Sequence, residues 1–426
     1  MTDRLARALG VFFAFPLKGD RDVYGVHQRV SMLIEGLGRI AKRVDLLFYV
    51  GADAPLEGIE VNNAVTRLGR RVAAEVRVEL CRRARVPVTG LSRRHYLTRF
   101  LLPGSVSVHR QPAFASFNGP EQVAALERVL GHRPELVLVH DSRTMAPFLK
   151  WGGALPPVVL DVDNIEHRIY LRHLMRSPAW PAERLRLAWI PALLVGEFTA
   201  YRLARRLFVC SDLDRRYLRR MAIRHASTVP NAVDMPSTVP SEPGPSRLLY
   251  LGKLDYGPNA TAVEHLVSNI WPRVRAAVPD AELWIAGAGS DEVRGSDRPP
   301  HGVRFLGFAE DLAALYASVR VVATPILVGG GTRFKLIEAA AYGKAIVSTT
   351  LGAEGLQLRP DVDIILRDSP AAFAEACIAL LRDDLSAASL GQSARSRVRG
   401  NYSRAAVVDS IATELRSVAS SAGALV

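Results

Sequence analysis

"VRVVATPILVGGGTRFKLIEAAAYGKAIVST", residues 319–349, contains one complete unit of strand, turn, helix and strand. The opening apolar run predicts a buried strand, and the three glycines predict a turn. A helix is expected to begin near Thr332 or Arg333, and "KAIVST" predicts the next strand. Near-continuous apolar strands that alternate with helices are typical of parallel sheets covered on both faces.

The same alternation continues through most of the chain. Strands are predicted at "ALGVFFAF", "RVDLLFYV", "ELVLVHD", "PVVLDVD" and "RLFVCSD", and in the second half at "RLLYLG", "AELWIAG" and "GVRFLG". The segment "VPNAVDMPSTVPSEPGPSR" carries five prolines and reads as a linker between two α/β domains. We expect an N-terminal domain at 1–232, a linker at 233–247, a C-terminal domain at 248–400 and a final segment at 401–426 that could pack back on the first domain. Ligands of such doubly wound sheets bind at the carboxyl ends of the strands, here in a cleft between the domains.

Bulk composition is that of a globular protein. The chain has 426 residues, of which 49% are hydrophobic and 23% are charged, enough for about two or three domains. No apolar run approaches the length of a membrane span, and the first residues do not resemble a secretory leader. The three cysteines are far apart and fit neither a disulfide framework nor a zinc cluster, which favours a cytoplasmic protein with buried thiols.

Positive charge is concentrated in the first half of the sequence. Residues 1–240 hold 36 Lys and Arg against 22 Asp and Glu, whereas residues 241–426 hold 19 against 20. The segment 81–110 mixes arginines with Tyr96, Phe100, Leu101 and Leu102, which suits an interfacial segment on the inner, anionic face of a membrane. Nucleic acid is an alternative that we do not favour, because no recognised nucleic-acid module is present. A solvated insertion is the other alternative.

The glycine turn of the opening stretch suits a phosphate. A glycine turn that enters a helix offers free backbone N–H groups to an anion. Arg333 and Lys335 oppose the positive end of the helix dipole unless an anion sits there, and a diphosphate would pair with both. Glu338 is placed to accept hydrogen bonds from two vicinal ribose hydroxyls. Alternatively, Lys335 and Glu338 form a surface i,i+3 pair and the glycines merely turn the chain.

Several segments together resemble glycosyltransferase family 4, the retaining enzymes of the GT-B fold. They are "VPNAVD", "LYLGKLDYGPNATAVEHL", "VRFLGFAEDLAALYASVRVVATP" and "TPILVGGGTRFKLIEAAAYGKAIVSTTLGAEGL", the last in the variant with a Gly-Gly-Gly-Thr-Arg donor loop. The resemblance implies two Rossmann-like domains facing across a cleft, and a metal-independent enzyme that uses no cofactor. The donor would be a nucleotide sugar such as a UDP-, GDP- or dTDP-sugar. The acceptor would be a glycan or lipid-linked hydroxyl, as in cell-surface polysaccharide, glycolipid or other glycoconjugate synthesis.

The resemblance also assigns donor-site residues. Glu338 matches the second glutamate of an E-x7-E motif that binds the ribose, and Gly330 stands in place of the first. Arg333 and Lys335 are expected to stabilise the leaving diphosphate as catalytic residues. Phe308, with Asp311 nearby, is expected beside the base, with core packing as the alternative for Phe308. The other expected donor-side residues are Gly329, Gly331, Thr332, Gly252, Lys253 and Gly25, with Gly19 an alternative to Gly25.

In the first domain, His140 at the end of "ELVLVH" is the catalytic candidate near the transferred sugar, although a strand-end histidine is often structural. Asp161-Val162-Asp163 has the D-x-D form of a metal–diphosphate motif, and with His167 it could hold Mg²⁺ or Mn²⁺. Residues one apart on a strand face opposite ways, so we prefer a structural pair and predict no metal site. The expected acceptor-side residues are Asp163, Asn164, Glu166 and His167.

Two other classes of protein remain open from the sequence. One is a different GT-B enzyme, such as a nucleotide-sugar epimerase or a phosphorylase with a pyridoxal cofactor. The other is a non-catalytic, lectin-like or scaffold protein, which the glycine at position 330 keeps under consideration.

Overall fold

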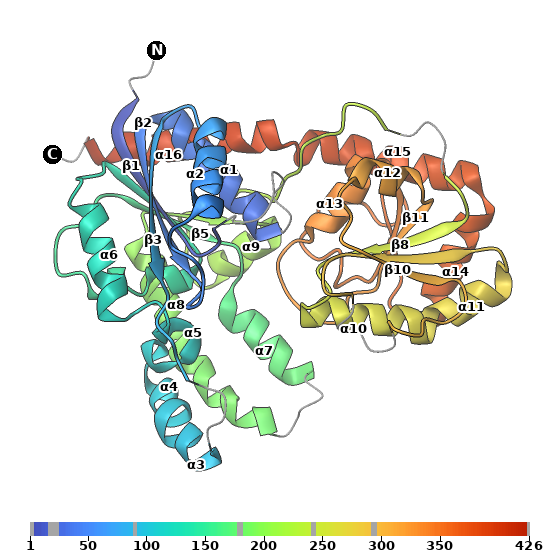
Figure 1. Cartoon of the computed structure of the whole chain (residues 1–426), viewed down its shortest axis with the longest axis horizontal. Helices are drawn as coiled ribbons and strands as arrows, with labels where there is room; N and C mark the ends of the chain where they lie inside the picture. The colour runs from blue at the N-terminus through green and yellow to red at the C-terminus, as the bar shows by residue number, and fades with distance from the viewer. Residues whose placement is uncertain are drawn as a thin grey trace. The chain divides into compact units, whose positions relative to one another are not determined.

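The computed structural model describes residues 4–15, 25–87, 92–176, 182–239, 244–290 and 296–423. The chain divides into two compact units, residues 1–229 with 406–426, and residues 230–405 (Figure 1). The division at 229/230 precedes the linker start expected from composition, because Asn231 and Val233 are buried within the second unit.

The first unit is built on a seven-stranded sheet in the order β3-β2-β1-β4-β5-β6-β7, with all neighbouring strands parallel. Every residue of β4 and β5 is buried, as expected for parallel strands covered on both faces. The strands are β1 (Leu5–Phe12), β2 (Ala41–Val50), β3 (Glu75–Arg82), β4 (Leu136–His140), β5 (Val158–Val162), β6 (Arg206–Val209) and β7 (Ala226–Thr228).

Helices and short turns of helix connect these strands. They are α1 (Gly25–Ile40), α2 (Ile59–Arg71), α3 (Arg93–Tyr96), η1 (Leu97–Leu101), α4 (Leu102–Val106), η2 (Val108–Arg110), α5 (Pro112–Ala115), α6 (Pro120–Leu130), η3 (Ser142–Met145), η4 (Phe148–Lys150), α7 (Glu166–Arg176), η5 (Ala182–Trp189), α8 (Ile190–Leu203) and α9 (Asp212–Arg220). The last helix, α16 (Arg404–Gly423), packs on α1 so closely that a Cβ at Gly36 would collide with Ile411. Arg39 and Asp409 form an ion pair across the same contact.

The second unit holds a six-stranded parallel sheet in the order β10-β9-β8-β11-β12-β13. Its strands are β8 (Arg247–Leu251), β9 (Glu282–Ala286), β10 (Val303–Gly307), β11 (Val321–Thr324), β12 (Ala345–Ser348) and β13 (Ile365–Leu366). Its helices are α10 (Gly257–His265), η6 (Leu266–Ile270), α11 (Trp271–Ala277), α12 (Leu312–Ala317), α13 (Phe334–Ala341), α14 (Pro370–Arg382) and α15 (Asp384–Asn401). Two buried apolar clusters lie in this unit, one containing Tyr250 and Phe373 and the other containing Tyr316 and Leu336.

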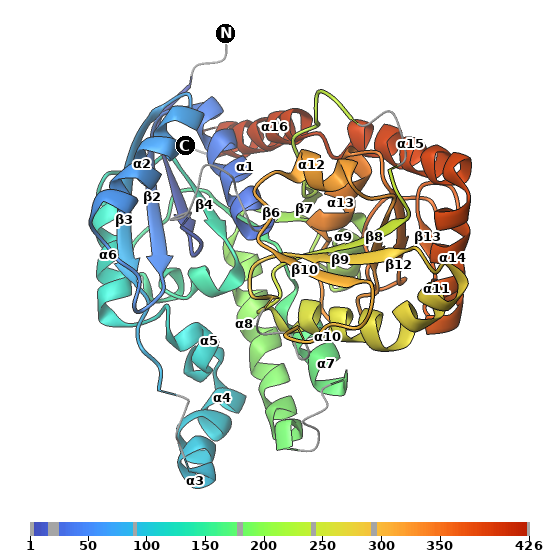
Figure 2. The same ribbon diagram turned by 45° about the vertical axis from the view of Figure 1, so that its right-hand side comes forward.

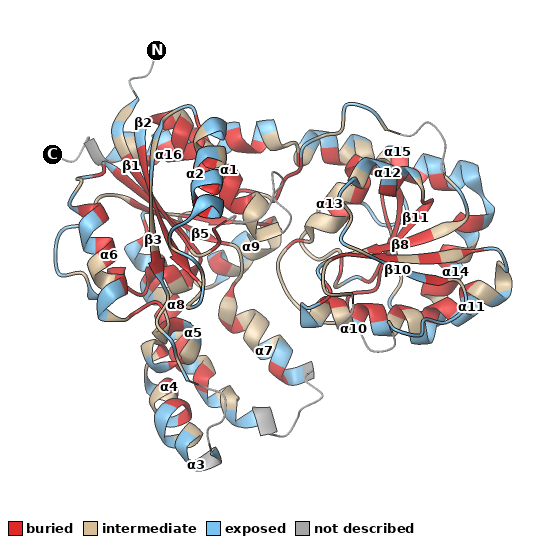
Figure 3. Ribbon diagram, in the orientation of Figure 1, coloured by how far each residue is buried: buried red, intermediate tan, exposed pale blue. Residues whose placement is uncertain are grey.

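Three described segments of the first unit form what we call the helical arm, residues 93–106, 166–176 and 182–203. Its elements, α3, η1 and α4 together with α7, η5 and α8, extend from the carboxyl-end side of the seven-stranded sheet (Figures 1 and 2). The arm has a small core in which Phe100 and Leu101 pack against Trp189. Phe100 and Leu101 are therefore buried, so neither residue can face a membrane surface as the sequence pattern suggested. The helices of the arm carry buried, intermediate and exposed residues (Figure 3).

Cys81, Cys210 and Cys377 are free thiols and all three are buried, as the sequence predicts. Among the residues that the structure describes, no helix combines the length and the apolar character needed to cross a bilayer.

Candidate functional site

The glycine run joins β11 to α13 in the second unit. Gly329 and Gly331 have φ values of 116° and 71°, which only glycine adopts readily, whereas Gly330 lies outside this left-handed region. Helix α13 begins at Phe334, one or two residues later than expected, because Arg333 is extended and forms the N-cap. The first backbone N–H groups of α13 have no partner within the helix, which makes this end suited to an anion.

Two side chains brace the glycine loop from within. The guanidinium of Arg333 turns back and donates to the carbonyl oxygens of Gly330 and Gly331. Asn231 Nδ2 donates to Thr332 Oγ1 at 2.9 Å, and both residues are buried. Asn231 was not singled out from the sequence, although it lies in the "VPNAVD" segment that carries part of the family resemblance. The expected phosphate-binding residue Arg333 therefore also holds the loop backbone.

Lys335 contacts residues of β8 and α10. Its ammonium donates to Asn259 Oδ1 at 2.8 Å and to the Tyr250 hydroxyl at 3.1 Å. It also lies 4.4 Å from the centre of the Tyr250 ring, a cation–π contact. The surface Lys335–Glu338 pair considered from the sequence is therefore not formed.

The environment of Lys335 lowers the pKa of its ammonium group. Burial, together with the nearby positive charge of Arg333, lowers the pKa of Lys335 to about 7. A Cβ at Gly252, just after β8, would collide with Lys335 Nζ, so a larger residue there would displace the ammonium group. A diphosphate beside Lys335 would counter this loss of charge.

Glu338 lies one turn into α13, where its Oε2 accepts a hydrogen bond from the Tyr316 hydroxyl at 3.2 Å. Phe308 follows β10 and is 51% exposed, so the core-packing alternative for this residue is wrong. Asp311 caps α12 by accepting from the Ala314 N–H at 3.1 Å. Lys253, just after β8, forms an ion pair of 2.9 Å with Asp255.

In the first unit, His140 ends β4 and is fully buried. Its Nδ1 lies 2.7 Å from Asp161 Oδ2, and the carboxylate can only accept, so Nδ1 is the donor. Its Nε2 is buried and has no hydrogen-bond partner among the residues that the structure describes. The ring stacks on Phe13 at 5.4 Å between centroids, with an angle of 9° between the planes. A buried polar atom that lacks a partner is uncommon and marks a position where a ligand atom could bind.

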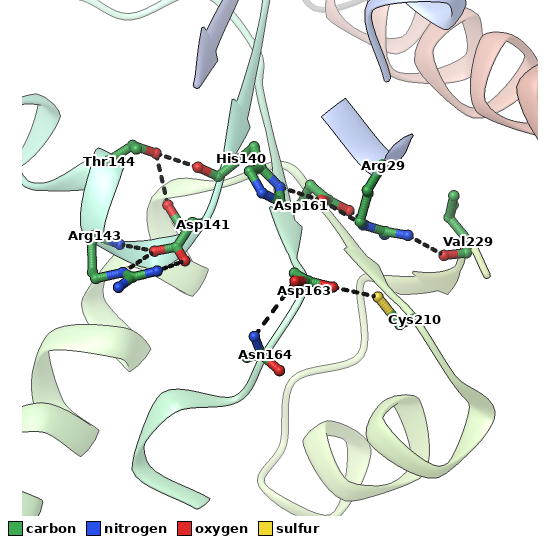
Figure 4. Close-up of polar contacts among 10 residues, drawn as sticks. All are labelled: Arg29, His140, Asp141, Arg143, Thr144, Asp161, Asp163, Asn164, Cys210 and Val229. Carbon is green, nitrogen blue, oxygen red and sulfur yellow. Dashed lines mark hydrogen bonds and ion pairs between the residues drawn. The ribbon is translucent and has the colours of Figure 1, made fainter. Parts of the chain in front are cut away.

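Asp161 holds both His140 and Arg29 (Figure 4). Arg29 Nε donates to Asp161 Oδ2 at 2.8 Å, its Nη2 donates to Oδ1, and its Nη1 donates to the Val229 carbonyl at 3.1 Å. Burial acts to raise the pKa of Asp161, but Arg29 and His140 together hold that pKa below its ordinary value. Arg29 was not recognised from the sequence, because α1 also carries other polar and charged residues, such as Gln28 and Glu35, and nothing local distinguishes Arg29 from them.

The D-x-D sequence does not bring its carboxylates to one point. Asp163 accepts from Cys210 Sγ at 3.2 Å and from Asn164 Nδ2 at 3.5 Å, separately from the Asp161 contacts (Figure 4). Across the described ranges, no group of three or more His, Cys, Asp or Glu side chains is arranged to hold a metal ion.

The loop after β4 is conformationally strained. Asp141 has a φ of 77°, which is rare for a non-glycine residue and tends to occur at functional sites. Its carboxylate accepts from Arg143 Nε at 2.8 Å, and Arg143 lies 5.0 Å from the centre of the Phe13 ring. Ser142 Oγ is also buried, and it too lacks a partner within the described part of the chain. His140 and Ser142 thus place two unsatisfied polar atoms at the end of one strand.

Helix α7 begins beside this loop. Glu197, which is buried, accepts from the backbone N–H groups of Glu166 and His167 and from His167 Nδ1 at 2.6 Å. His167 Nε2 is hydrogen-bonded to the Tyr217 hydroxyl at 2.7 Å, so both ring nitrogens are engaged within the protein. Glu197 was missed from the sequence because it is 31 residues from Glu166 along the chain.

The carboxyl group of Glu166 has a raised pKa. Burial and the nearby carboxylates of Asp141, Glu197 and Asp163 raise the pKa of Glu166 to about 8, although Arg143 opposes them. Its carboxyl is therefore protonated at neutral pH and able to donate a hydrogen bond to a hydroxyl. Gly25 is the first residue of α1, and Gly19 lies outside the described residues.

Comparison with solved structures identifies the fold as GT-B, the two-unit α/β architecture expected above. A sucrose-phosphate synthase from Thermosynechococcus elongatus has a TM-score of 0.69 and 17% identity, with coverage of 97% of this chain and 100% of that chain. The Anabaena protein HepE, in complex with UDP and glucose, has a TM-score of 0.62 and 15% identity, covering 97% and 100%. An α,α-trehalose-phosphate synthase (UDP-forming) from Burkholderia vietnamiensis has a TM-score of 0.59 and 15% identity, covering 98% of each chain.

The sequence itself matches a family over part of its length. Residues 245–383 match the family described as glycosyl transferases group 1. This range contains the glycine loop, Lys335 and Glu338. No curated protein sequence gives a significant match to the chain.

Proposed function

We propose that this protein is a retaining glycosyltransferase that moves a sugar from a nucleoside-diphosphate sugar to a hydroxyl acceptor. The observation that carries the proposal is the site at the glycine loop, where Lys335, Arg333 and the start of α13 converge within the segment that matches glycosyl transferases group 1. UDP-sugars are the donors to test first, because HepE was solved with UDP-glucose and the related trehalose-phosphate synthase is UDP-forming.

The second unit would bind the nucleotide. Glu338 would accept hydrogen bonds from the ribose hydroxyls, and Phe308, which is half exposed, would contact the base. The diphosphate would lie against the N–H groups of α13, with Lys335 and Arg333 as charged partners. These contacts strengthen as charge develops on the leaving diphosphate, so they would lower the barrier without a metal ion.

The first unit would bind the acceptor, with His140 Nε2 available to the transferred sugar and the protonated Glu166 to an acceptor hydroxyl. In the reaction, the bond between the anomeric carbon and the phosphate oxygen breaks, and a bond from that carbon to the acceptor oxygen forms on the same face. The leaving phosphate oxygen takes the acceptor proton, so no fixed general base is needed. Asp163 and Asn164 would contribute further polar contacts to the acceptor.

A direct test is titration calorimetry of the purified protein with UDP-, GDP- and dTDP-glucose, followed by an assay for slow donor hydrolysis. We expect one nucleotide class to bind in the micromolar range, about −8 kcal/mol, and to be hydrolysed slowly in the absence of acceptor. Retention would be read from the anomeric configuration of the product by NMR. A protein that binds free sugars but no nucleotide sugar would contradict the proposal and indicate a carbohydrate-binding scaffold.

A further inference from the structure

The helical arm displays an unusual share of the exposed apolar side chains. Of the thirteen large hydrophobic side chains classed as exposed in the described residues, seven lie on the elements of the arm, one of them (Leu203) in the last turn of α8, which packs on the sheet through Ala200 and Tyr201. They are Leu102, Val106, Leu171, Met175, Leu185, Val195 and Leu203. Single exposed apolar residues are normal on any protein, but a concentration on one projection indicates an interaction surface.

These residues are not the uncovered core of an incomplete fold. The arm already has its own core, in which Trp189 Nε1 donates to the Leu101 carbonyl at 3.1 Å. Gln111, which is buried, donates to the carbonyls of Gly104 and Trp189 at 2.9 and 3.1 Å and closes the base of the arm. Val106, in contrast, is 85% exposed and Met175 is 66% exposed, so both lie outside this packed interior.

The arm is also strongly basic. Its first segment, 93–106, has three arginines and no Asp or Glu, and its other segments, 166–176 and 182–203, together have six arginines against three glutamates. Arg94 and Arg99 are exposed on the same segment as Leu102 and Val106. Exposed aliphatic side chains among arginines suit the interface of an anionic bilayer, where the cations meet lipid phosphates and the apolar groups enter the acyl boundary.

Other occupants fit this surface less well. A single-stranded nucleic acid would need exposed aromatic rings for stacking, whereas Phe100 and Trp189 are buried. A second copy of the chain would bring two basic arms together, and their like charges would oppose association.

We propose that the helical arm docks the protein on anionic membrane surfaces. Helix α7 connects this surface to the site in the first unit, because it begins at Glu166 and carries Leu171 and Met175 farther along. Its 11 residues span roughly 15 Å. Docking of the arm would therefore hold the acceptor-side residues at about this distance from the lipid. The inference rests on the arm alone and does not depend on the proposed catalytic activity.

The test is co-sedimentation of the full chain with phosphatidylcholine vesicles, with and without phosphatidylglycerol, at low and high salt. We expect binding only to the anionic vesicles, weakened by salt. Combining Arg94→Gln with Arg99→Gln is expected to weaken binding by roughly 25-fold, and combining Leu102→Ser with Val106→Ser by on the order of tenfold.

Matched controls are exposed residues outside the arm, Arg224→Gln with Arg298→Gln, and Ile59→Ser with Leu385→Ser, which are expected to bind like the unmodified protein. Equal binding to neutral vesicles, no binding to either kind, or unchanged binding by the arm variants would overturn the proposal. A change of oligomeric state in the arm variants without any change in lipid binding would assign the surface to a second copy instead. Nucleotide binding, measured in parallel, separates these outcomes from a failure of the proposed activity.

Discussion

His140 Nδ1 and Asp161 Oδ2 lie 2.7 Å apart in the first unit, and neither side chain is exposed to solvent. Because Asp161 also pairs with Arg29, its charge is compensated and its position is set by two partners. With Nδ1 bound to this carboxylate, Nε2 is the ring nitrogen left to contact a ligand. The hydrogen bond between His140 and Asp161 therefore fixes the orientation of the candidate catalytic histidine in the ligand-free protein.

Asp161→Asn is expected to lower the free energy of unfolding by about 3–5 kcal/mol, because Arg29 would remain buried without a counter-charge. The pKa of Asp161 is depressed in the folded state, so its stabilising effect is present above the unfolded value of about 3.9 and is lost below it. Urea denaturation at neutral and acidic pH would show a difference from the unmodified protein that shrinks in acid. Asp163→Asn, the control on the same strand end, should cost less than about 1 kcal/mol; an equal loss would contradict this account.

His140→Gln is expected to reduce kcat by on the order of 100-fold while leaving the Kd for the nucleotide nearly unchanged. The physical reason is that Nε2 is the buried polar atom available to the transferred sugar, whereas the nucleotide contacts belong to the second unit. Steady-state kinetics with calorimetry of nucleotide binding would check both quantities. Unchanged kcat in a folded variant would reduce His140 to a structural role.

Arg333→Ala is expected to weaken donor binding by about 10- to 100-fold, which corresponds to about 1.5–3 kcal/mol for a hydrogen bond to a charged group. The loss would combine a missing phosphate contact with a loop that has lost its brace on Gly330 and Gly331. Lys344→Met is the control: Lys344 Nζ donates to the Val319 carbonyl, so this change should reduce stability and leave donor affinity intact. Donor affinity that survives Arg333→Ala would remove Arg333 from the proposed site.

Donor binding is expected to take up a proton between about pH 7 and pH 9. The pKa of Lys335 is about 7 because of burial and the charge of Arg333, and a bound diphosphate would raise it. Calorimetry in two buffers of different ionisation enthalpy would measure close to one proton per nucleotide at about pH 8. The linkage should disappear in Lys335→Met. Since the folded pKa lies below the unfolded value, the free energy of unfolding of the ligand-free protein should also rise as pH increases above about 7.

Gly331→Ala is expected to destabilise the donor loop by about 1 kcal/mol or more and to weaken nucleotide binding, because alanine is strained at a φ of 71°. Gly330→Ala is the matched control, since Gly330 has no such φ, and we expect it to be nearly neutral. Thermal unfolding and nucleotide titration of the two variants would compare them. Equal effects at both positions would indicate that space, and not backbone conformation, limits the loop.

Local patterns predicted the elements well. The apolar runs before "GGGTRF" and after "AAAYGK" are strands β11 and β12, and the helix between them begins within two residues of the expected start. Periodicity succeeds here because strand and helix patterns depend on neighbours within a few residues. It was less informative for the helical arm, where Phe100 and Leu101 looked like interfacial residues but are covered by Trp189 from a distant segment.

The sequence by itself determined the parallel α/β class, the glycine loop and the basic character of the first half, because these follow from local composition and backbone preference. Only the tertiary structure decided the partners of the functional side chains. Asp161 meets Arg29 from 132 residues away, and Lys335 meets Tyr250 from 85 residues away. Parallel strands bring such distant residues together at one end of the sheet. Burial makes an unpaired polar or charged group there costly, so each pairing matters for stability. The spacing of the residues in the sequence does not reveal which pairs form.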